Sequence, residues 1–315
     1  MSINGKKEIY LFGIIVALCI EWNITMHQKR GGLFAAAQLL TPENLNNFDR
    51  NNDMMSPINA AKQKLKNDDL AIGMGVRNFR GSEISSIMKS AGYDWLFIDL
   101  EHGPTSIESA ASICITSLAN GIAPIVRVPQ GDLNLGARCL DAGALGIVMP
   151  HVDTVEEATK MAEAFRFKPF GRRSIAGNYP HFSFEARSAI ETTTILNEAT
   201  LLVAMMETPE AINNIDAIAA VPGIDILLMG TNDLCLEMGI PGEIDHPKVS
   251  TAVDKLVAAC KRHGKWAGIG GVYESELLTR YINQGVQMIL AGNDVTLLLD
   301  AATEKARLIK ECDKR

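Results

Sequence analysis

The chain has 315 residues, of which 47% are hydrophobic and 21% are charged, which is too apolar for a disordered chain, and its 26 Gly and 12 Pro residues are too few for a fibrous one. The 30 basic and 37 acidic residues give a net charge of −7, which argues against broad nucleic-acid binding because that function needs a basic surface. The six cysteines form no CxxC pair and no Cys/His cluster, which predicts reduced thiols rather than a zinc or redox centre.

The N-terminal part differs from the rest in composition. Residues 9–20 form an uncharged apolar run that is too short to cross a membrane, where a helix needs about 20 residues, but resembles the core of a signal peptide. Residues 41–69 are polar and rich in Asn and Asp, which is typical of a linker. We therefore expect 1–54 to be a leader, either disordered or signal-like, and 55–315 to be the folded domain. We expect a cytoplasmic protein, with membrane association or secretion through the apolar run as the alternative.

From residue 70 onward, short apolar runs rich in Val, Ile and Leu alternate with amphipathic stretches such as 82–91, 154–165 and 249–263. Thr154 and Glu157 match the capping-box pattern, which supports a helix start there. Eight strands alternating with helices predict a (β/α)₈ barrel, also called a TIM barrel, with a doubly wound open sheet as the alternative. The predicted strands are residues 71–76, 95–100, 124–128, 145–150, 201–207, 225–230, 266–270 and 287–291.

The connection between the fourth and fifth predicted strands, at about 50 residues, is long for a βα connection. It holds the helix 154–165 and then the segment 171–187, which we interpret as an irregular functional loop or an oligomer contact. Arg172 and Arg173 in this segment could reach an anionic substrate or a neighbouring subunit, or form a solvated pair.

Polar residues gather where the predicted strands end, and in a (β/α)₈ barrel the carboxyl ends of the strands form the active site. Glu207 and Asp233 end neighbouring strands, so together they can form an oxygen-only half-site for Mg²⁺ or Mn²⁺. The alternative is structural, with Asp233 capping a helix and Glu207 pairing with Arg127. The Gly-Thr-Asn-Asp turn at 230–233 can also aim backbone N–H groups at a substrate carboxylate.

The candidate substrate-binding and acid/base side chains lie at the ends of the second, third and fourth predicted strands. Arg127 offers a permanently charged fork for a keto-acid oxygen, or else a structural ion pair at the barrel mouth. His102 follows Asp99 by three residues. If Asp99 accepts a hydrogen bond from one ring nitrogen, the other nitrogen can act as base or acid; a turn histidine bonded to backbone is the alternative. His151 has the same two interpretations.

These residues stand in segments that resemble the HpcH/HpaI aldolase family, the metal-dependent pyruvate aldolases with a (β/α)₈ barrel. The segment around His151, followed by Gly-Arg-Arg-Ser, also resembles the fungal macrophomate synthase branch. Two departures stand out: Met205 replaces a glutamine found in some bacterial members, and Gly-Thr-Asn-Asp replaces the family turn Gly-Pro-Ala-Asp. The matching segments are residues 91–104, 124–129, 140–158, 171–174, 206–234 and 270–271.

The resemblance implies a role for each candidate residue. Glu207 and Asp233 fall on the family's metal carboxylates, for Mg²⁺ or Mn²⁺ with Co²⁺ as a further option. Arg127 falls on the arginine that polarises the keto oxygen, and His102 falls with Asp99 on the acid/base dyad. The remaining candidates for substrate binding are the backbone amides of Asn232 and Asp233, which fall where the pyruvate carboxylate binds, and His151.

The resemblance further implies a class II aldolase that cleaves 4-hydroxy-2-oxo acids to pyruvate and an aldehyde through a metal-bound pyruvate enolate. It also implies a homo-oligomer, often a hexamer, that acts on a small 2-keto acid and binds no nucleic acid. Three alternatives stay open: an oxaloacetate decarboxylase like macrophomate synthase, a citrate-lyase-like enzyme acting on an acyl-CoA, and a catalytically inactive barrel that serves as a binding protein.

Overall fold

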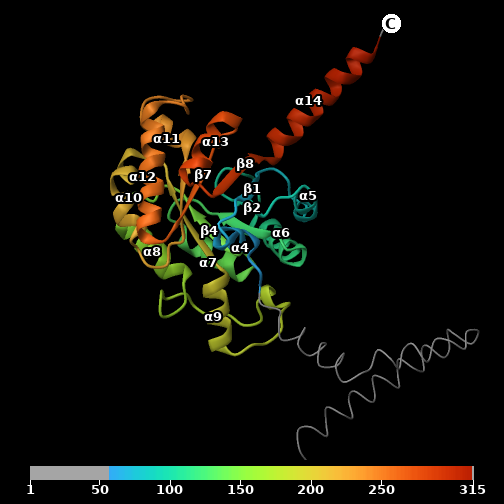
Figure 1. Ribbon diagram of the computed structural model, residues 1–315. Coiled ribbons are helices and arrows are strands. Elements are labelled where there is room, and N and C mark those ends of the chain that lie inside the picture. The colour runs from blue at the N-terminus through green and yellow to red at the C-terminus, as the bar shows by residue number, and fades with distance from the viewer. Residues whose placement is uncertain (1–56, 314–315) are drawn as a thin grey trace, which may run out of the picture. The chain divides into compact units, whose positions relative to one another are not determined.

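The computed structural model describes residues 57–313, so the predicted leader with its apolar run at 9–20 lies outside the described residues. Within this range, parallel strands pair in chain order and close into a barrel, with β8 beside β1 (Figure 1). The predicted (β/α)₈ barrel is confirmed, and the open sheet is wrong. The strands are β1 (Ala71–Val76), β2 (Trp95–Asp99), β3 (Ala123–Arg127), β4 (Gly146–Met149), β5 (Leu201–Met206), β6 (Ile226–Gly230), β7 (Trp266–Gly270) and β8 (Met288–Asn293).

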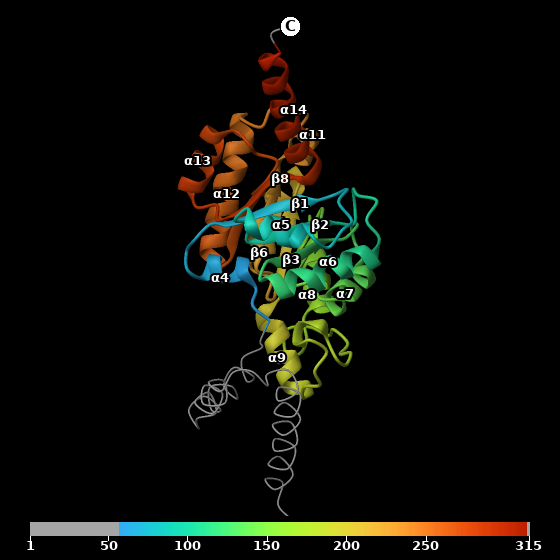
Figure 2. The ribbon, with the colours of Figure 1, turned by 90° about the vertical axis from the view of Figure 1, so that its right-hand side faces the viewer.

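Helices surround the barrel (Figures 1 and 2). The helices within residues 57–313 are α4 (Ala60–Lys66), α5 (Ile84–Ser90), α6 (Ile107–Asn120), α7 (Leu133–Asp141), α8 (Val155–Phe165), α9 (Ala189–Ala199), α10 (Pro209–Ala219), α11 (Thr231–Glu237), α12 (Pro247–His263), α13 (Ser275–Gln284) and α14 (Asp294–Cys312), with a 3₁₀ turn at Pro180–Phe182. The three predicted helices correspond to α5, α8 and α12. Thr154 and Glu157 form the predicted capping box, in which each side chain accepts a backbone N–H of the other residue.

Side chains alternate between the interior of the barrel and its outer face, as the geometry of a strand requires. The inward side chains of the strands form one core cluster, and the outward ones pack with the helices in another. This alternation makes Asp99, Arg127, Met205 and Gly230 the last inward positions of β2, β3, β5 and β6. Two residues beyond Met205, the same alternation directs Glu207 inward. The sequence thereby places polar groups at the mouth of an otherwise apolar barrel.

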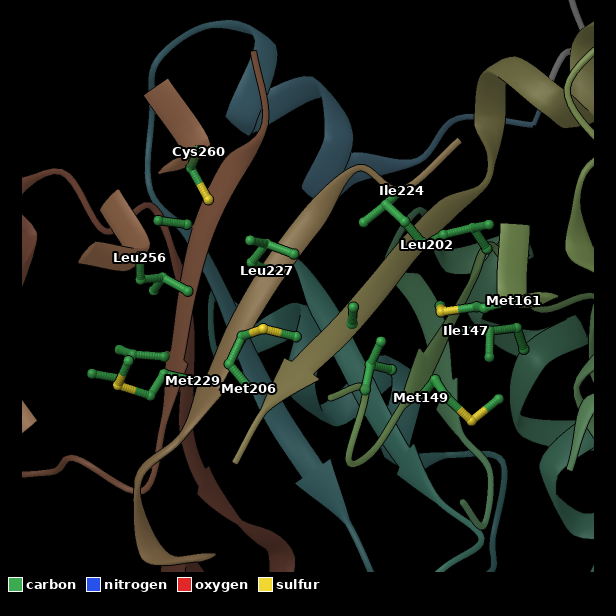
Figure 3. Close-up of a cluster of buried hydrophobic side chains, with 14 of the residues drawn as sticks. Ile147, Met149, Met161, Leu202, Met206, Ile224, Leu227, Met229, Leu256 and Cys260 are labelled. Carbon is green, nitrogen blue, oxygen red and sulfur yellow. The ribbon is translucent and has the colours of Figure 1, made fainter. Parts of the chain in front are cut away.

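The outer core lies between the barrel wall and the helices. Figure 3 shows part of it, in which outward side chains of β4, β5 and β6 meet Met161 from α8 and Leu256 and Cys260 from α12. All three of these helical residues are at most 2% exposed. Burial of such apolar area stabilises the fold by roughly 25 cal/mol per Å², and it fixes the strand ends that carry the polar residues.

The opposite end of the barrel is closed by α4. Ala61 and Leu65 of this helix are buried against the inward side chains of the strands. Asn59, which caps the helix, donates through Nδ2 to the carbonyls of Leu145 (3.0 Å) and Ala199 (2.8 Å) at the amino ends of β4 and β5. The barrel is therefore open to ligands at its carboxyl end.

The long connection between β4 and β5 is more regular than predicted. Besides α8 it holds α9, which the sequence did not indicate to us, while 171–187 is irregular apart from the 3₁₀ turn. Arg173 is buried: its Nη2 donates to Asp141 at 2.7 Å, and its guanidinium lies over the ring of Phe167 at 4.6 Å. The interpretation of Arg172 and Arg173 as a solvated pair is thus wrong for Arg173, because an aromatic face and a carboxylate enclose it.

The last helix, α14, follows β8 directly and extends away from the barrel (Figures 1 and 2). None of its side chains is buried. Among residues 57–313, no helix combines the length and the apolar character needed to cross a membrane.

Candidate active site

A cavity of about 130 Å³ opens at the carboxyl end of the barrel. Every strand except β4 contributes to its lining, with apolar side chains such as Phe97, Met205 and Leu228 on the inner wall. Six of the seven predicted site residues line it; the exception is His151. The six are Asp99, His102, Arg127, Glu207, Asn232 and Asp233.

Asp99 and Arg127 form a buried two-point ion pair across neighbouring strands, where they are register partners. Arg127 donates from Nε to Asp99 Oδ1 (3.0 Å) and from Nη2 to Asp99 Oδ2 (2.6 Å). Burial by itself would raise the pKa of Asp99, but the hydrogen bonds and charge of Arg127 outweigh it and keep that pKa below its usual value. Asp99 therefore stays ionised and fixes the plane of the guanidinium.

The geometry corrects the expected contact between Asp99 and the ring of His102. Asp99 Oδ1 accepts the backbone N–H groups of Glu101 and His102, both at 3.1 Å, in addition to Arg127 Nε. The carboxylate near the imidazole is instead that of Glu101, with Oε2 at 3.8 Å from Nε2, and Glu101 also pairs with Arg127 Nη1 at 3.1 Å. Asp99 thus positions His102 through the main chain, and Glu101 connects its ring to Arg127. Sequence spacing alone did not reveal this role of Glu101.

Glu207 is an almost fully buried carboxylate at the cavity wall, with 1% of its surface exposed. Its Oε2 accepts the backbone N–H of His151 at 2.9 Å, and the ring Nδ1 of His151 lies 3.7 Å away. Burial raises the pKa of Glu207 to about 7, the charge of Asp233 adds to the rise, and His151 and Arg127 oppose it. Burial therefore disfavours the charged form of Glu207, and a cation bound beside it would favour that form.

His151 occupies the left-handed region with φ of 48°, which is unusual for a residue other than glycine. This conformation accompanies the N–H bond to Glu207. His151 does not line the main cavity; it lines a neighbouring hollow with Met149, Pro150 and Met161. Because its backbone N–H holds the Glu207 carboxylate, His151 is a positioning residue for that carboxylate.

The residues around Glu207 fit a divalent cation. The structure records no hydrogen bond to Oε1 of Glu207 within the described residues, and a Cβ added to Gly230 would lie only 2.4 Å from that oxygen. Because Gly230 has no side chain, a space remains beside this buried carboxylate oxygen, and we call that space the Gly230 cradle. Asp233, in the first turn of α11, is close enough to affect the pKa of Glu207. Among residues 57–313 no group of three or more His, Cys, Asp or Glu is placed to hold a metal ion, so an ion bound here would need further ligands from water or substrate, as Mg²⁺ commonly has.

The structural alternatives for these two carboxylates do not match the geometry. The ion pairs of Arg127 within the described range are with Asp99 and Glu101, not with Glu207. Asp233 does not cap α11, which begins after Gly230 without a side-chain cap. The backbone N–H groups of its first turn are therefore available to an anion, since the first turn of a helix has no partners of its own for them.

Two further lining residues were missed by sequence reasoning. Arg77 follows β1 and donates from Nε to Asp99 Oδ2 at 3.4 Å, and Tyr273 follows the Gly270-Gly271 turn after β7. Arg77 could have been predicted as a site residue from the sequence, because it is a charged residue that directly follows the predicted strand 71–76.

The comparison with known proteins fits this geometry. A model of the HpcH/HpaI aldolase/citrate lyase family matches residues 80–301. The chain belongs to this family. Like the predicted fold, the predicted HpcH/HpaI membership is confirmed.

Two curated relatives of the family show its chemistry. The chain is 35% identical over 264 residues to a 4-hydroxy-4-methyl-2-oxoglutarate aldolase of Chaetomium globosum, covering 82% of this chain and 98% of that protein. It is 31% identical over 254 residues to a hydroxypyruvate/pyruvate aldolase of Pseudomonas aeruginosa, covering 81% and 94%. The prediction of an aldolase, a carbon–carbon lyase, is thereby confirmed at the level of enzyme class.

Solved structures give the same result for the HpcH/HpaI barrel. The HpcH/HpaI aldolase from Desulfitobacterium hafniense superposes with a TM-score of 0.76 at 27% identity, covering 80% of this chain and 97% of that one. Macrophomate synthase superposes with a TM-score of 0.66 at 26% identity, covering 82% and 92%. Both branches considered from the sequence are thus structural relatives.

Proposed function

We propose that the chain cleaves 4-hydroxy-2-oxo acids into pyruvate and a carbonyl product, with a divalent metal ion held by Glu207 and Asp233. The observation that carries this proposal is the buried Glu207 carboxylate beside the Gly230 cradle, at the mouth of a barrel of the HpcH/HpaI family. Bound Mg²⁺ or Mn²⁺ would act as a Lewis acid that stabilises negative charge developing on the substrate.

The protein's own residues would bind and orient the 2-oxo acid. Its carboxylate would accept backbone N–H groups from the first turn of α11, those of Asn232 and Asp233 among them. Arg127 has five N–H donors, of which the two recorded hydrogen bonds to Asp99 use one on Nε and one on Nη2. Nη1 forms an ion pair with Glu101, so the terminal nitrogens retain N–H donors for the keto oxygen. Because Asp99 fixes the guanidinium, these donors are oriented before the substrate binds.

Cleavage requires a base for the C4 hydroxyl proton. We assign this role to His102, whose ring is 54% exposed at the cavity and lies near Glu101. As the proton leaves, the C3–C4 bond breaks and its electrons move toward the C2 oxygen, giving the enolate of pyruvate and an aldehyde or ketone. Protonation of C3 then yields pyruvate.

A second candidate reaction is the decarboxylation of oxaloacetate, which needs no base. It is favoured by one observation, that Asp99 does not hold the imidazole of His102 in place. The similarity to macrophomate synthase adds to it. Both reactions produce the same pyruvate enolate, so the two use the same binding groups.

Pyruvate release tests the proposal. Purified protein is given a 4-hydroxy-2-oxo diacid or oxaloacetate, first with EDTA and then with Mg²⁺ or Mn²⁺. We expect metal to restore release, and His102→Ala to lower aldol cleavage far more than decarboxylation. His263→Ala is the matched control, because this histidine pairs with Asp216 outside the cavity. Absence of pyruvate from both substrates with every metal would contradict the proposal.

Assembly into a homo-oligomer, with a hexamer as the family's common form, stays a prediction. Light scattering on the full chain measures it, and a monomer at micromolar concentration would contradict it.

A further inference from the structure

The cavity contains a second arginine that the proposed reaction does not use. Arg77 lies directly after β1, its side chain is 41% exposed, and it lines the cavity together with Tyr273. Of its side-chain nitrogens, only Nε has a recorded partner within residues 57–313, namely Asp99 Oδ2 at 3.4 Å. Within the described residues, no hydrogen bond or ion pair is recorded for its two terminal nitrogens. Arg77 therefore presents a guanidinium edge that an anion can reach.

The two arginines of the cavity differ in how far carboxylates neutralise them. Arg127 is buried, hydrogen-bonded to Asp99 and ion-paired with Glu101. Arg77 shares Asp99 with Arg127, and no second carboxylate pairs with it in the part of the chain that the structure describes. Its charge also reaches Tyr273: burial raises the pKa of that phenol, and Arg77 opposes the rise. The positive potential left over in the cavity is thus on the Arg77 side.

The backbone of Arg77 is held in place before any ligand binds. Asp294 Oδ2, at the start of α14, accepts the N–H groups of Arg77 (3.0 Å), Asn78 (2.8 Å) and Phe79 (2.7 Å). Gly103 packs against the Arg77 carbonyl, since an added Cβ would lie 2.6 Å from that oxygen. A guanidinium on a fixed backbone loses less entropy on binding than one on a mobile loop.

The position of Arg77 around the barrel gives it a different partner from Arg127. In the strand order of the closed barrel, β1 lies opposite β5, and Glu207 directly follows β5. A substrate whose oxo-acid end lies at β5 and β6 extends its other end toward β1. A carboxylate on that end would meet Arg77, whereas a methyl group would leave the guanidinium without a partner.

We propose that Arg77 binds a second carboxylate at the far end of the substrate, so that the site selects dicarboxylic 2-oxo acids. This inference rests on the proposed function for the placement of the oxo-acid end. Arg77 is then a specificity residue, and its contact with Asp99 orients it for that role.

The test compares two substrates that differ only at C5. These are 4-hydroxy-2-oxoglutarate, with a carboxylate there, and 4-hydroxy-2-oxopentanoate, with a methyl group. We expect Arg77→Gln to lower the ratio of kcat/KM for the diacid over the monoacid at least tenfold, mainly through KM. Arg80→Gln is the matched control, since it removes the same charge from an exposed residue of the same loop outside the cavity lining. A ratio that stays within twofold, with both substrates losing activity in proportion, would overturn the proposal and show that Arg77 acts through Asp99.

A binding measurement separates this inference from the proposed function. The dissociation constants of 2-oxoglutarate and 2-oxopentanoate, which cannot be cleaved because they lack the C4 hydroxyl, are measured by calorimetry with Mg²⁺ present. We expect the wild type to bind the diacid more tightly than the monoacid. We expect Arg77→Gln to lower the ratio of the two affinities at least tenfold. If no substrate yields pyruvate but this preference is present and depends on Arg77, the proposed reaction fails and the dicarboxylate site stands. If the preference is absent or survives in Arg77→Gln, the dicarboxylate site fails.

Discussion

Gly230→Ala is the substitution that probes the metal cradle with the smallest change. Gly230 has φ −90° and ψ 92°, a conformation open to any residue, so alanine adds no backbone strain. Its Cβ, however, would lie 2.4 Å from Glu207 Oε1, 2.8 Å from Cγ and 3.0 Å from Cδ. The single methyl group therefore acts on the Glu207 side chain.

The size of the effect follows from these distances. Ordinary contact with a Cβ begins at 3.4 Å, so Oε1 has to move by about 1 Å. Glu207 is 1% exposed and its Oε2 is held by the N–H of His151, which leaves little room for a rotation. Metal ligands tolerate errors of about 0.2 Å, and a misplacement of about 1 Å in a site costs on the order of 100-fold. We expect Mn²⁺ affinity to fall about 100-fold, or about 2.7 kcal/mol.

Electron paramagnetic resonance of free Mn²⁺ during a titration measures this affinity, and circular dichroism checks the fold. Gly270→Ala is the matched control, because Gly270 is the register partner of Gly230 on β7 and its added Cβ would meet Leu290 at an ordinary 3.4 Å. We expect the control to bind Mn²⁺ within threefold of the wild type. A folded Gly230→Ala protein that binds Mn²⁺ as the wild type does would refute the placement of the metal beside Glu207 Oε1.

Three further predictions concern single residues. Arg127→Lys keeps the positive charge but loses the two-point contact with Asp99. We expect kcat to fall at least about tenfold in steady-state kinetics, while the Mn²⁺ affinity measured by titration stays as in the wild type. Burial lowers the pKa of His181 from 6.5 to about 4, so the folded state binds fewer protons than the unfolded state between these values. The contribution of His181 to the free energy of unfolding is therefore complete above pH 6.5 and falls by up to about 3 kcal/mol toward pH 4. In urea unfolding, the free energy of unfolding of His181→Asn should depend less on pH than that of the wild type. The same pH dependence in both proteins would contradict this. A Gly→Ala change in a helix normally stabilises it by about 1 kcal/mol, but the Cβ of Gly136→Ala would lie 2.4 Å from the buried ring of Phe165. We therefore expect the free energy of unfolding in urea to fall by about 1–2 kcal/mol, and a rise would contradict this packing.

The barrel could be predicted because its strands are short apolar runs with a clear period. All eight predicted strands lie within about two residues of the observed ones, an error typical of element boundaries. The helix α9 was missed because Thr192, Thr193, Thr194 and Ile195 are β-branched and favour strand or loop. The available signal was the capping box that begins at Ser188, a few residues before them.

The candidate site was partly predictable for a similar reason. Alternation along β2, β3 and β5 directs Asp99, Arg127 and Glu207 inward, so their meeting at the mouth follows from the strands. The partners of each side chain do not follow, because beyond the strand ends the chain direction depends on tertiary contacts. Glu101 and Arg77 therefore entered the site only with the structure: one pairs with Arg127, and the other shares Asp99.

The central claim is that Glu207 and Asp233 hold the metal on which cleavage depends. Its most direct test is pyruvate release from a 4-hydroxy-2-oxo diacid by protein stripped with EDTA, as Mg²⁺ or Mn²⁺ is added back to the wild type, Glu207→Ala and Asp233→Ala. We predict saturable recovery in the wild type and none in either variant, with all three proteins folded by circular dichroism. Recovery like that of the wild type in either variant would contradict the claim.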